Sequence, residues 1–148
     1  MAMVAPLLMI LMLGAMELGH YFYSQHVVVK AVRDGARYAS RHDFSNFTCP
    51  STVNPTVESN TQNVTRTNQV AAGGNPRLAA WTLNSSVFVT MRCDTSGTYG
   101  SFYTGLGAGV PVVKVRAVVP YSSLFSVIGF NSVGLQMQAE SEAAVMGL

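Results

Sequence analysis

The chain opens with Ala2–His42, AMVAPLLMILMLGAMELGHYFYSQHVVVKAVRDGARYASRH, a stretch that changes character about halfway along. Residues 1–16 carry no charged side chain, and Glu17 is the first charge. Sixteen helical residues reach about 24 Å, slightly short of a hydrocarbon core of about 30 Å, and extension to Tyr23 closes the difference. We therefore predict that the chain begins with a membrane-spanning helix whose tyrosines lie at the interface.

The second half of this stretch keeps a helical pattern and does not break into a loop. Small and branched apolar residues recur through 27–39 at helical spacing, whereas a cleaved secretory signal has a basic start and a cleavage site that are not found here. We predict one helix over about 2–42, roughly 60 Å long and twice the thickness of the bilayer core. Its outer half must therefore leave the lipid.

This outer half is predicted to have two distinct faces. One face is a basic stripe made of Lys30, Arg33, Arg37 and Arg41. The other face holds Ala31, Gly35 and Ala39, small residues four apart that let another backbone approach closely. Two interpretations stay open: the apolar face packs on the protein's own head, or such helices pack between subunits while the basic stripe meets acidic groups or lipid headgroups.

Glu17 is the most informative single residue of the apolar half. An ionised carboxylate at membrane depth is costly and is usually paired. Glu17 either makes a registry contact with a basic group of a neighbouring subunit or simply reaches the outer interface, some 24 Å along the axis. Gly14 and Gly19 lie close to it in the sequence, and we expect all three to take part in packing between assembly helices.

Composition excludes several classes of protein. Charged residues make up 11% of the chain, against roughly 25% in an ordinary soluble domain. Hydrophobic residues make up 49%, so the chain is not intrinsically disordered. The net charge of +2 is too weak to argue for nucleic acid, and we expect no nucleic-acid partner.

The two cysteines, Cys49 and Cys93, both lie in sequence rich in Ser, Thr and Asn. Buried free thiols are one interpretation. The polar surroundings favour instead a disulfide formed in an oxidising compartment. Such a bond contributes roughly 4 kcal/mol on a chain-entropy estimate.

Residues 43–148 predict a small α+β head outside the cytoplasm. A weak helical pattern covers 56–72 and ends at two glycines, and a second short helix is predicted over 78–83. Alternation with a period of two predicts three strands, which follow at 85–93, 110–119 and 135–145, with a short helix or turn over 121–129.

These strands are predicted to form an antiparallel sheet with one face on the long helix and the other in water. On the solvent-exposed face, residues of opposite charge are expected to pair across neighbouring strands, which stabilises the sheet. Lys114 and Arg116 are expected opposite Glu140 and Glu142.

No arrangement of residues in the sequence predicts catalysis. His20 and His26 lie about 240° apart around a helix and cannot share a metal ion from one face. The glycine-rich run at 105–109 lacks the Lys-Ser/Thr pair of a phosphate-binding loop. We expect a non-enzymatic protein that has no metal site and no cofactor.

Three N-terminal segments carry a family resemblance: AMVAPLL at 2–8, GAMELG at 14–19 and, most specifically, VRDGARYA at 32–39. Together they resemble the start of TadE-like proteins, which are pseudopilins of the tight-adherence (Tad/Flp, type IVc) pilus system. The alternating strands on either side of a Val-Pro-Tyr corner at 119–121 are also similar. The resemblance covers roughly 2–42 and 110–148, and the middle of the chain is only compatible with it.

The sequence departs from the family pattern at its start. The family's basic leader, its peptidase site after Gly and the Glu near the mature N-terminus do not occur here, and His20 stands where Arg is common. Basic residues follow the span, which by the positive-inside rule places the head in the cytoplasm, whereas the cysteines and the polar head favour export. A basic leader preceding Met1 reconciles the two, and we expect one.

The resemblance implies a pilin-like fold, with residues 1–42 as the membrane and filament-core helix and 43–148 as the head. It implies a subunit held in the bacterial inner membrane facing the periplasm, then polymerised through its helix into an extracellular filament, as minor pseudopilin or main subunit. The implied partners are other copies or sister pilins, the inner-membrane pilus assembly machinery and the lipid bilayer.

Two other functions stay open. In one, the chain is a membrane-tethered adhesion module that does not polymerise and binds a surface ligand through the loop 94–109. In the other, it is a permanently anchored periplasmic protein.

Overall fold

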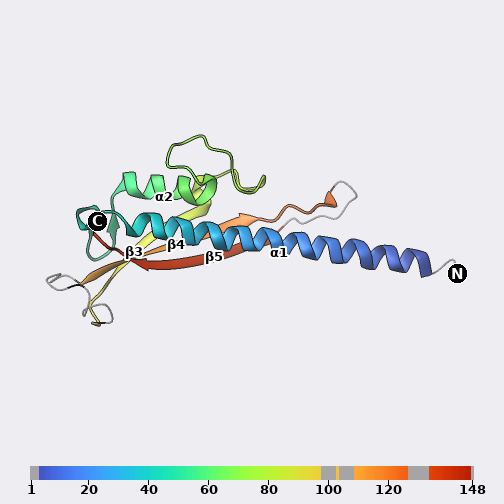
Figure 1. Cartoon of the computed structure of the whole chain (residues 1–148), viewed down its shortest axis with the longest axis horizontal. Helices are drawn as coiled ribbons and strands as arrows, with labels where there is room; N and C mark the ends of the chain where they lie inside the picture. Colours follow the sequence, from blue (N-terminus) through green and yellow to red (C-terminus); the bar gives the residue numbers. More distant parts are fainter. Residues whose placement is uncertain (1–3, 98–102, 104–108, 127–133, 148) are drawn as a thin grey trace.

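One long helix organises the whole molecule. The structure is a computed structural model that describes residues 4–97, 103, 109–126 and 134–147. Helix α1 (Val4–Ser40) confirms the predicted continuous helix over 2–42, with residues 1–3 outside the described part. Its second half lies along the head and its first half projects beyond it (Figure 1). The other elements are η1 (Phe44–Asn46), β1 (Phe47–Thr48), β2 (Thr52–Val53), α2 (Pro55–Thr67), η2 (Asn84–Ser86), β3 (Val87–Asp94), β4 (Val110–Pro120) and β5 (Gln136–Ala144).

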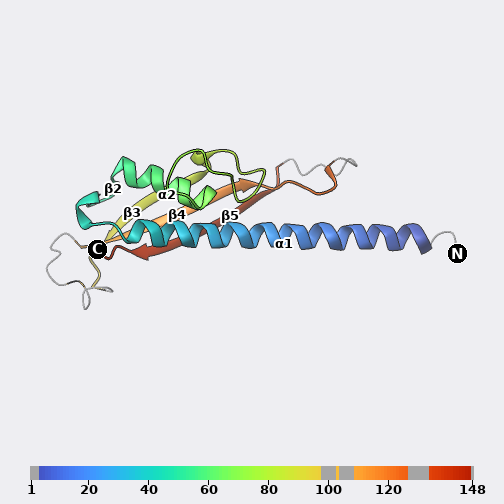
Figure 2. The ribbon, with the colours of Figure 1, turned by 45° about the horizontal axis from the view of Figure 1, so that its top comes forward.

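The head is built on a three-stranded antiparallel sheet in the order β3-β4-β5, which confirms the predicted α+β fold. The register places Met91 opposite Val113 and Val113 opposite Ala143, so apolar positions of the three strands fall on one face. Helix α1 lies over β4 and β5, and α2 lies over β3 and against α1. The two helices thus form one layer on one face of the sheet (Figure 2).

The core fills the space between this helical layer and the sheet. Val28 and Val32 of α1, like Val113 and Val115 of β4, are completely buried. Each fully buried side chain of this size contributes roughly 1.5–3 kcal/mol. The outer half of α1 is therefore held by its own head, which accounts for a helix that continues beyond the length needed to cross a bilayer.

Helix α2 begins and ends at asparagines. The Asn54 side chain accepts a hydrogen bond from the Thr56 N–H at 2.9 Å, and Pro55 occupies the first turn. Asn68 adopts a left-handed conformation, with φ of 62°, and its N–H donates to the Val64 carbonyl. The predicted extension of the helix to residue 72 is therefore wrong, because Asn68 ends it before the glycines.

The predicted helix over 78–83 is wrong as well, because this segment forms turns. Six residues are too few to form a helix without support from packing. The segment is fixed instead by the buried Trp81, whose indole N–H donates to Ser86 Oγ at 2.8 Å.

The exposed face of the sheet carries the predicted charge pairs. Lys114 lies opposite Glu142 in the register, and its ammonium is 2.9 Å from Glu140 and 3.8 Å from Glu142. Arg116 lies opposite Glu140 but donates to the Gln138 side chain at 3.0 Å. The face is polar and solvated, as alternation predicts.

A disulfide joins Cys49, in the turn after β1, to Cys93 in β3. The two residues are 44 apart in the sequence, and their Cα atoms lie 5.9 Å apart. Closing a loop of this length contributes about 4 kcal/mol on the chain-entropy estimate. The β1–β2 hairpin, which the sequence did not predict because each strand has only two residues, is fastened to the sheet in this way.

Candidate functional site

The first half of α1 presents apolar side chains to the outside on all sides. Its large hydrophobic residues are more than a third exposed, with Met12 at 72%. The exposed set is Val4, Leu7, Leu8, Met9, Ile10, Leu11, Met12, Leu13, Met16 and Leu18. Among the described residues, α1 is the one helix that is long and apolar enough to cross a membrane. An apolar surface of this size requires lipid or protein around it.

Gly14 and Gly19 both lie on this open surface. A Cβ atom built on either glycine would meet no other atom of the described chain within 4 Å. Small residues on an open helix surface let a second helix come close. Both positions are therefore free for the packing role that we predict for them.

Glu17 lies where the apolar half meets the head, and its carboxylate has partners in its own chain. The Tyr121 hydroxyl donates to Glu17 Oε1 at 2.7 Å, and the Leu124 N–H donates to Oε2 at 3.2 Å. His20 Nδ1 lies 3.1 Å from the Tyr121 hydroxyl, and Tyr21 packs edge-on against the Tyr121 ring. A contact between Glu17 and a neighbouring subunit's basic group stays a prediction, but the carboxylate does not need one to be satisfied.

The row of small residues faces inward. Ala31 and Ala39 are completely buried, and Gly35 lies so close to Thr65 of α2 that a Cβ atom on Gly35 would collide with the threonine hydroxyl. Of the two interpretations left open by the sequence, the structure has packing on the protein's own head. A role of these three residues in packing between subunits stays a prediction, although they are already buried within the subunit.

The basic stripe faces outward. Lys30, Arg33, Arg37 and Arg41 are all exposed, and within the described residues none of them forms an ion pair. Asp34, the acidic residue between them, is paired elsewhere. The stripe thus leaves four positive charges on one side of α1, free for an acidic partner.

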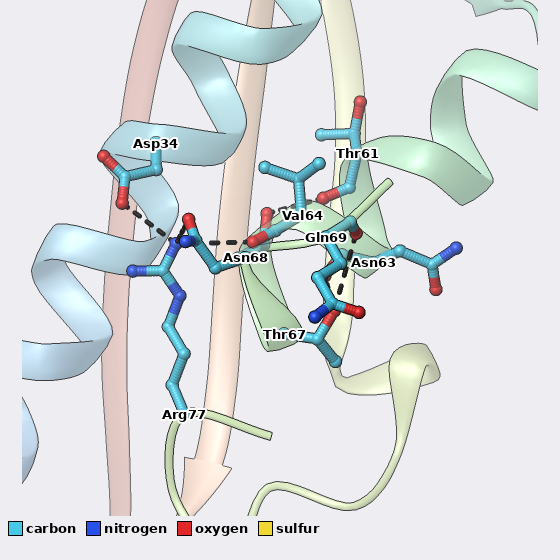
Figure 3. Close-up of polar contacts among 9 residues, drawn as sticks. Asp34, Thr61, Asn63, Val64, Thr67, Asn68, Gln69 and Arg77 are labelled. Carbon is cyan, nitrogen blue, oxygen red and sulfur yellow. Dashed lines mark hydrogen bonds and ion pairs between the residues drawn. The ribbon is translucent and has the colours of Figure 1, made fainter. Parts of the chain in front are cut away.

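Asp34 belongs to a polar cluster that joins α1 to α2, shown in Figure 3. The Arg77 guanidinium lies 2.9 Å from Asp34 Oδ2 and donates to the Asn68 side chain at 2.9 Å and to the Val64 carbonyl at 3.4 Å. The Arg77 side chain is 14% exposed. It therefore links the long helix to the C-terminal end of α2. Sequence analysis missed this pair, because Arg77 follows a Gly-Gly-Asn-Pro run that predicts only a turn.

The remaining predictions concern the loop 94–109 and metal binding. The loop 94–109, expected to bind a surface ligand, lies mostly outside the described residues. No group of three His, Cys, Asp or Glu side chains in the described part could hold a metal ion.

Comparison with protein families finds a match at the N-terminus. Residues 1–37 match the model of the TadE-like protein family. The TadE-like segment confirms the resemblance for the N-terminal part and supports, at the level of the family, a pilin-like protein associated with a Tad pilus. TadE-like proteins are structural and not enzymatic. The similarity over 110–148 stays a prediction, and no curated protein and no solved structure matches the chain.

Proposed function

We propose that this chain is a pilin-like structural subunit that is anchored by α1 in the bacterial inner membrane and polymerises through it into a Tad-type pilus or related filament. The observation that carries the proposal is the exposed apolar half of α1, which falls within the TadE-like segment 1–37. This half fits a bilayer before assembly and a bundle of like helices afterwards. The head stays outside the cytoplasm, facing the periplasm and later the outside of the cell.

When α1 leaves the lipid and packs against neighbouring helices, the exposure of its apolar side chains to water changes little, because both surroundings are apolar. Close packing at small residues and a few polar contacts then decide which helices associate. Gly14 and Gly19 are the exposed small residues that fit this role. The partners would be other copies or sister pilins, brought together by the inner-membrane assembly machinery.

The basic stripe supports a second contact between subunits. Lys30 lies seven residues after Tyr23 and hence about 10 Å beyond the interface, and Arg41 lies further out still. Salt weakens the attraction between exposed charges beyond about 8–10 Å, so lipid headgroups attract most of the stripe only weakly. An acidic surface on a neighbouring pilin therefore fits the stripe better than lipid. Replacing Arg33 and Arg37 by Gln should lower filament yield without lowering membrane insertion, and unchanged yield would exclude this contact.

The decisive experiment places a large side chain on the open surface of α1. Gly14→Leu should leave the fold of the monomer and membrane insertion intact, because no other part of the described chain lies within 4 Å of a Cβ atom at that position. It should remove filaments from sheared surface material examined by electron microscopy, with the subunit identified by its peptides. Met12→Leu, which places a leucine at another exposed position of the same helix while conserving side-chain volume, is the control and should assemble normally.

The alternatives predict different results. A permanently anchored protein is recovered only in membranes, with or without Gly14→Leu. A membrane-tethered adhesion module keeps ligand binding in Gly14→Leu and loses it when the loop 94–109 is changed. Abundant filaments that contain the Gly14→Leu chain would contradict packing at Gly14.

A further inference from the structure

The connection between β4 and β5 lies farther toward the N-terminus than any other described part of the head. After Pro120 the chain continues along α1 past the end of the sheet, in both views (Figure 1, Figure 2). Its turn reaches the level of Glu17, since the Leu124 N–H donates to the Glu17 carboxylate. Leu135, at the return of the connection, is held at the same level by the hydrogen bond from Tyr121 N–H to the Leu135 carbonyl at 2.9 Å.

This level lies inside the proposed bilayer. With Tyr23 at the interface, Glu17 lies six residues or about 9 Å deeper. The turn that contacts Glu17 is therefore level with lipid and not with water.

The connection has the surface that such a position requires. Residues 121–135 contain no Asp, Glu, Lys or Arg. Leu124 is 45% exposed and Leu135 is 56% exposed, and Leu18 on the adjoining helix surface is 54% exposed. These side chains extend the apolar surface of α1 sideways at the depth of Glu17.

Part of the backbone of the described turn is satisfied within the chain, as lipid requires because polar groups there have no water to bond. Three of its N–H groups have acceptors within the chain. They are Tyr121 N–H to Leu135 O, Leu124 N–H to Glu17 Oε2, and Phe125 N–H to Ser123 Oγ at 3.1 Å. Glu17 in turn receives the hydrogen bonds that a carboxylate in lipid needs.

We propose that the described ends of the β4–β5 connection, residues 121–126 and 134–135, enter the outer part of the bilayer beside α1, so that the turn at Tyr121–Leu124 supplies hydrogen bonds to Glu17 within the lipid. The head then contacts the membrane at two places, which fixes its orientation about the axis of α1. This inference rests on the membrane anchoring proposed above. The partner of the surface is the acyl-chain region of the bilayer.

Tryptophan quenching in vesicles tests the inference in the full chain. The unmodified protein has a single, fully buried tryptophan, Trp81, which sets the baseline. The chain is reconstituted at low protein density in phosphatidylcholine vesicles with brominated acyl chains, and a tryptophan is added at one exposed position at a time. Leu124→Trp and Leu135→Trp report on the connection, and Leu8→Trp reports on the anchor. Met146→Trp is the outer control, because the Met146 N–H donates to the Ser40 carbonyl at the far end of α1.

The expected result is a blue-shifted emission that the brominated lipid quenches for Leu8→Trp, Leu124→Trp and Leu135→Trp, but not for Met146→Trp. Quenching of Leu8→Trp alone would overturn the inference and leave the anchoring intact. Absence of quenching at all four positions would overturn both. The two connection variants give independent readings, so that a local disturbance at one of them does not decide the outcome.

Discussion

Asp34 and Arg77 form an ion pair of 2.9 Å that fastens the long helix to the C-terminal end of α2. The Arg77 side chain is 14% exposed, and its guanidinium also donates to Asn68 and Val64. One side chain therefore joins α1, the C-terminal end of α2 and its own segment (Figure 3). Asp34 lies within residues 1–37, the segment that matches the TadE-like family. A role within the fold therefore accounts for this aspartate without any partner outside the subunit.

Asp34→Asn should lower the free energy of unfolding of the head by about 2 kcal/mol, because it leaves a mostly buried guanidinium without its counter-charge. Urea unfolding of the full chain in detergent micelles, followed by Trp81 emission, measures this change. Glu142→Gln is the matched control: its ion pairs with Arg92 and Lys114 lie on the solvated face of the sheet, and their loss should change stability by less than about 0.5 kcal/mol. Equal effects of the two substitutions would contradict the structural role of Asp34.

Gly35→Ala should destabilise the head by about 1–3 kcal/mol, because the new methyl group collides with Thr65 in a packed core. The Thr65 hydroxyl cannot easily move away, since it donates to the Thr61 carbonyl at 2.7 Å. The same unfolding measurement applies. Gly14→Ala is the control and should not lower head stability, because its surroundings are open.

A double substitution shows that the collision is the cause. Adding Thr65→Ala to Gly35→Ala should cost less than the sum of the two single changes, because removing the hydroxyl makes room for the methyl group. Strict additivity would mean that Gly35 is required for another reason. Loss of filaments in Gly35→Ala would then follow from the damaged head and not from lost packing between subunits.

Much of the fold could be predicted from local patterns, which depend only on residues close to one another in the sequence. The strand at 135–145 was predicted from strict alternation of apolar and polar residues, and β5 occupies Gln136–Ala144. The charge pairing of Lys114 with Glu140 and Glu142 follows from the same alternation once neighbouring strands are aligned. The predicted helix over 78–83 failed because its short apolar pattern also fits a turn held by a buried tryptophan.

The candidate site was harder to predict, because its contacts join residues far apart in the chain. The residues of the stripe, the small row and Glu17 were all identified from the sequence, but their partners were not. Tyr121 lies 104 residues from Glu17, and its hydrogen bond depends on how far the β4–β5 connection runs along α1. No local pattern encodes that distance.

The sequence by itself determined a continuous helix that is apolar first and amphipathic afterwards, three alternating strands and two cysteines in polar surroundings. These features rest on helical and strand periodicity and on composition, which need no knowledge of the packed arrangement. Only the tertiary structure decided which neighbour covers each face: Ala31, Gly35 and Ala39 turn toward their own head, while Gly14, Gly19 and the basic stripe remain exposed. The physical reason is that an apolar face fits several partners almost equally well, and the choice among them depends on the shape that the whole chain presents.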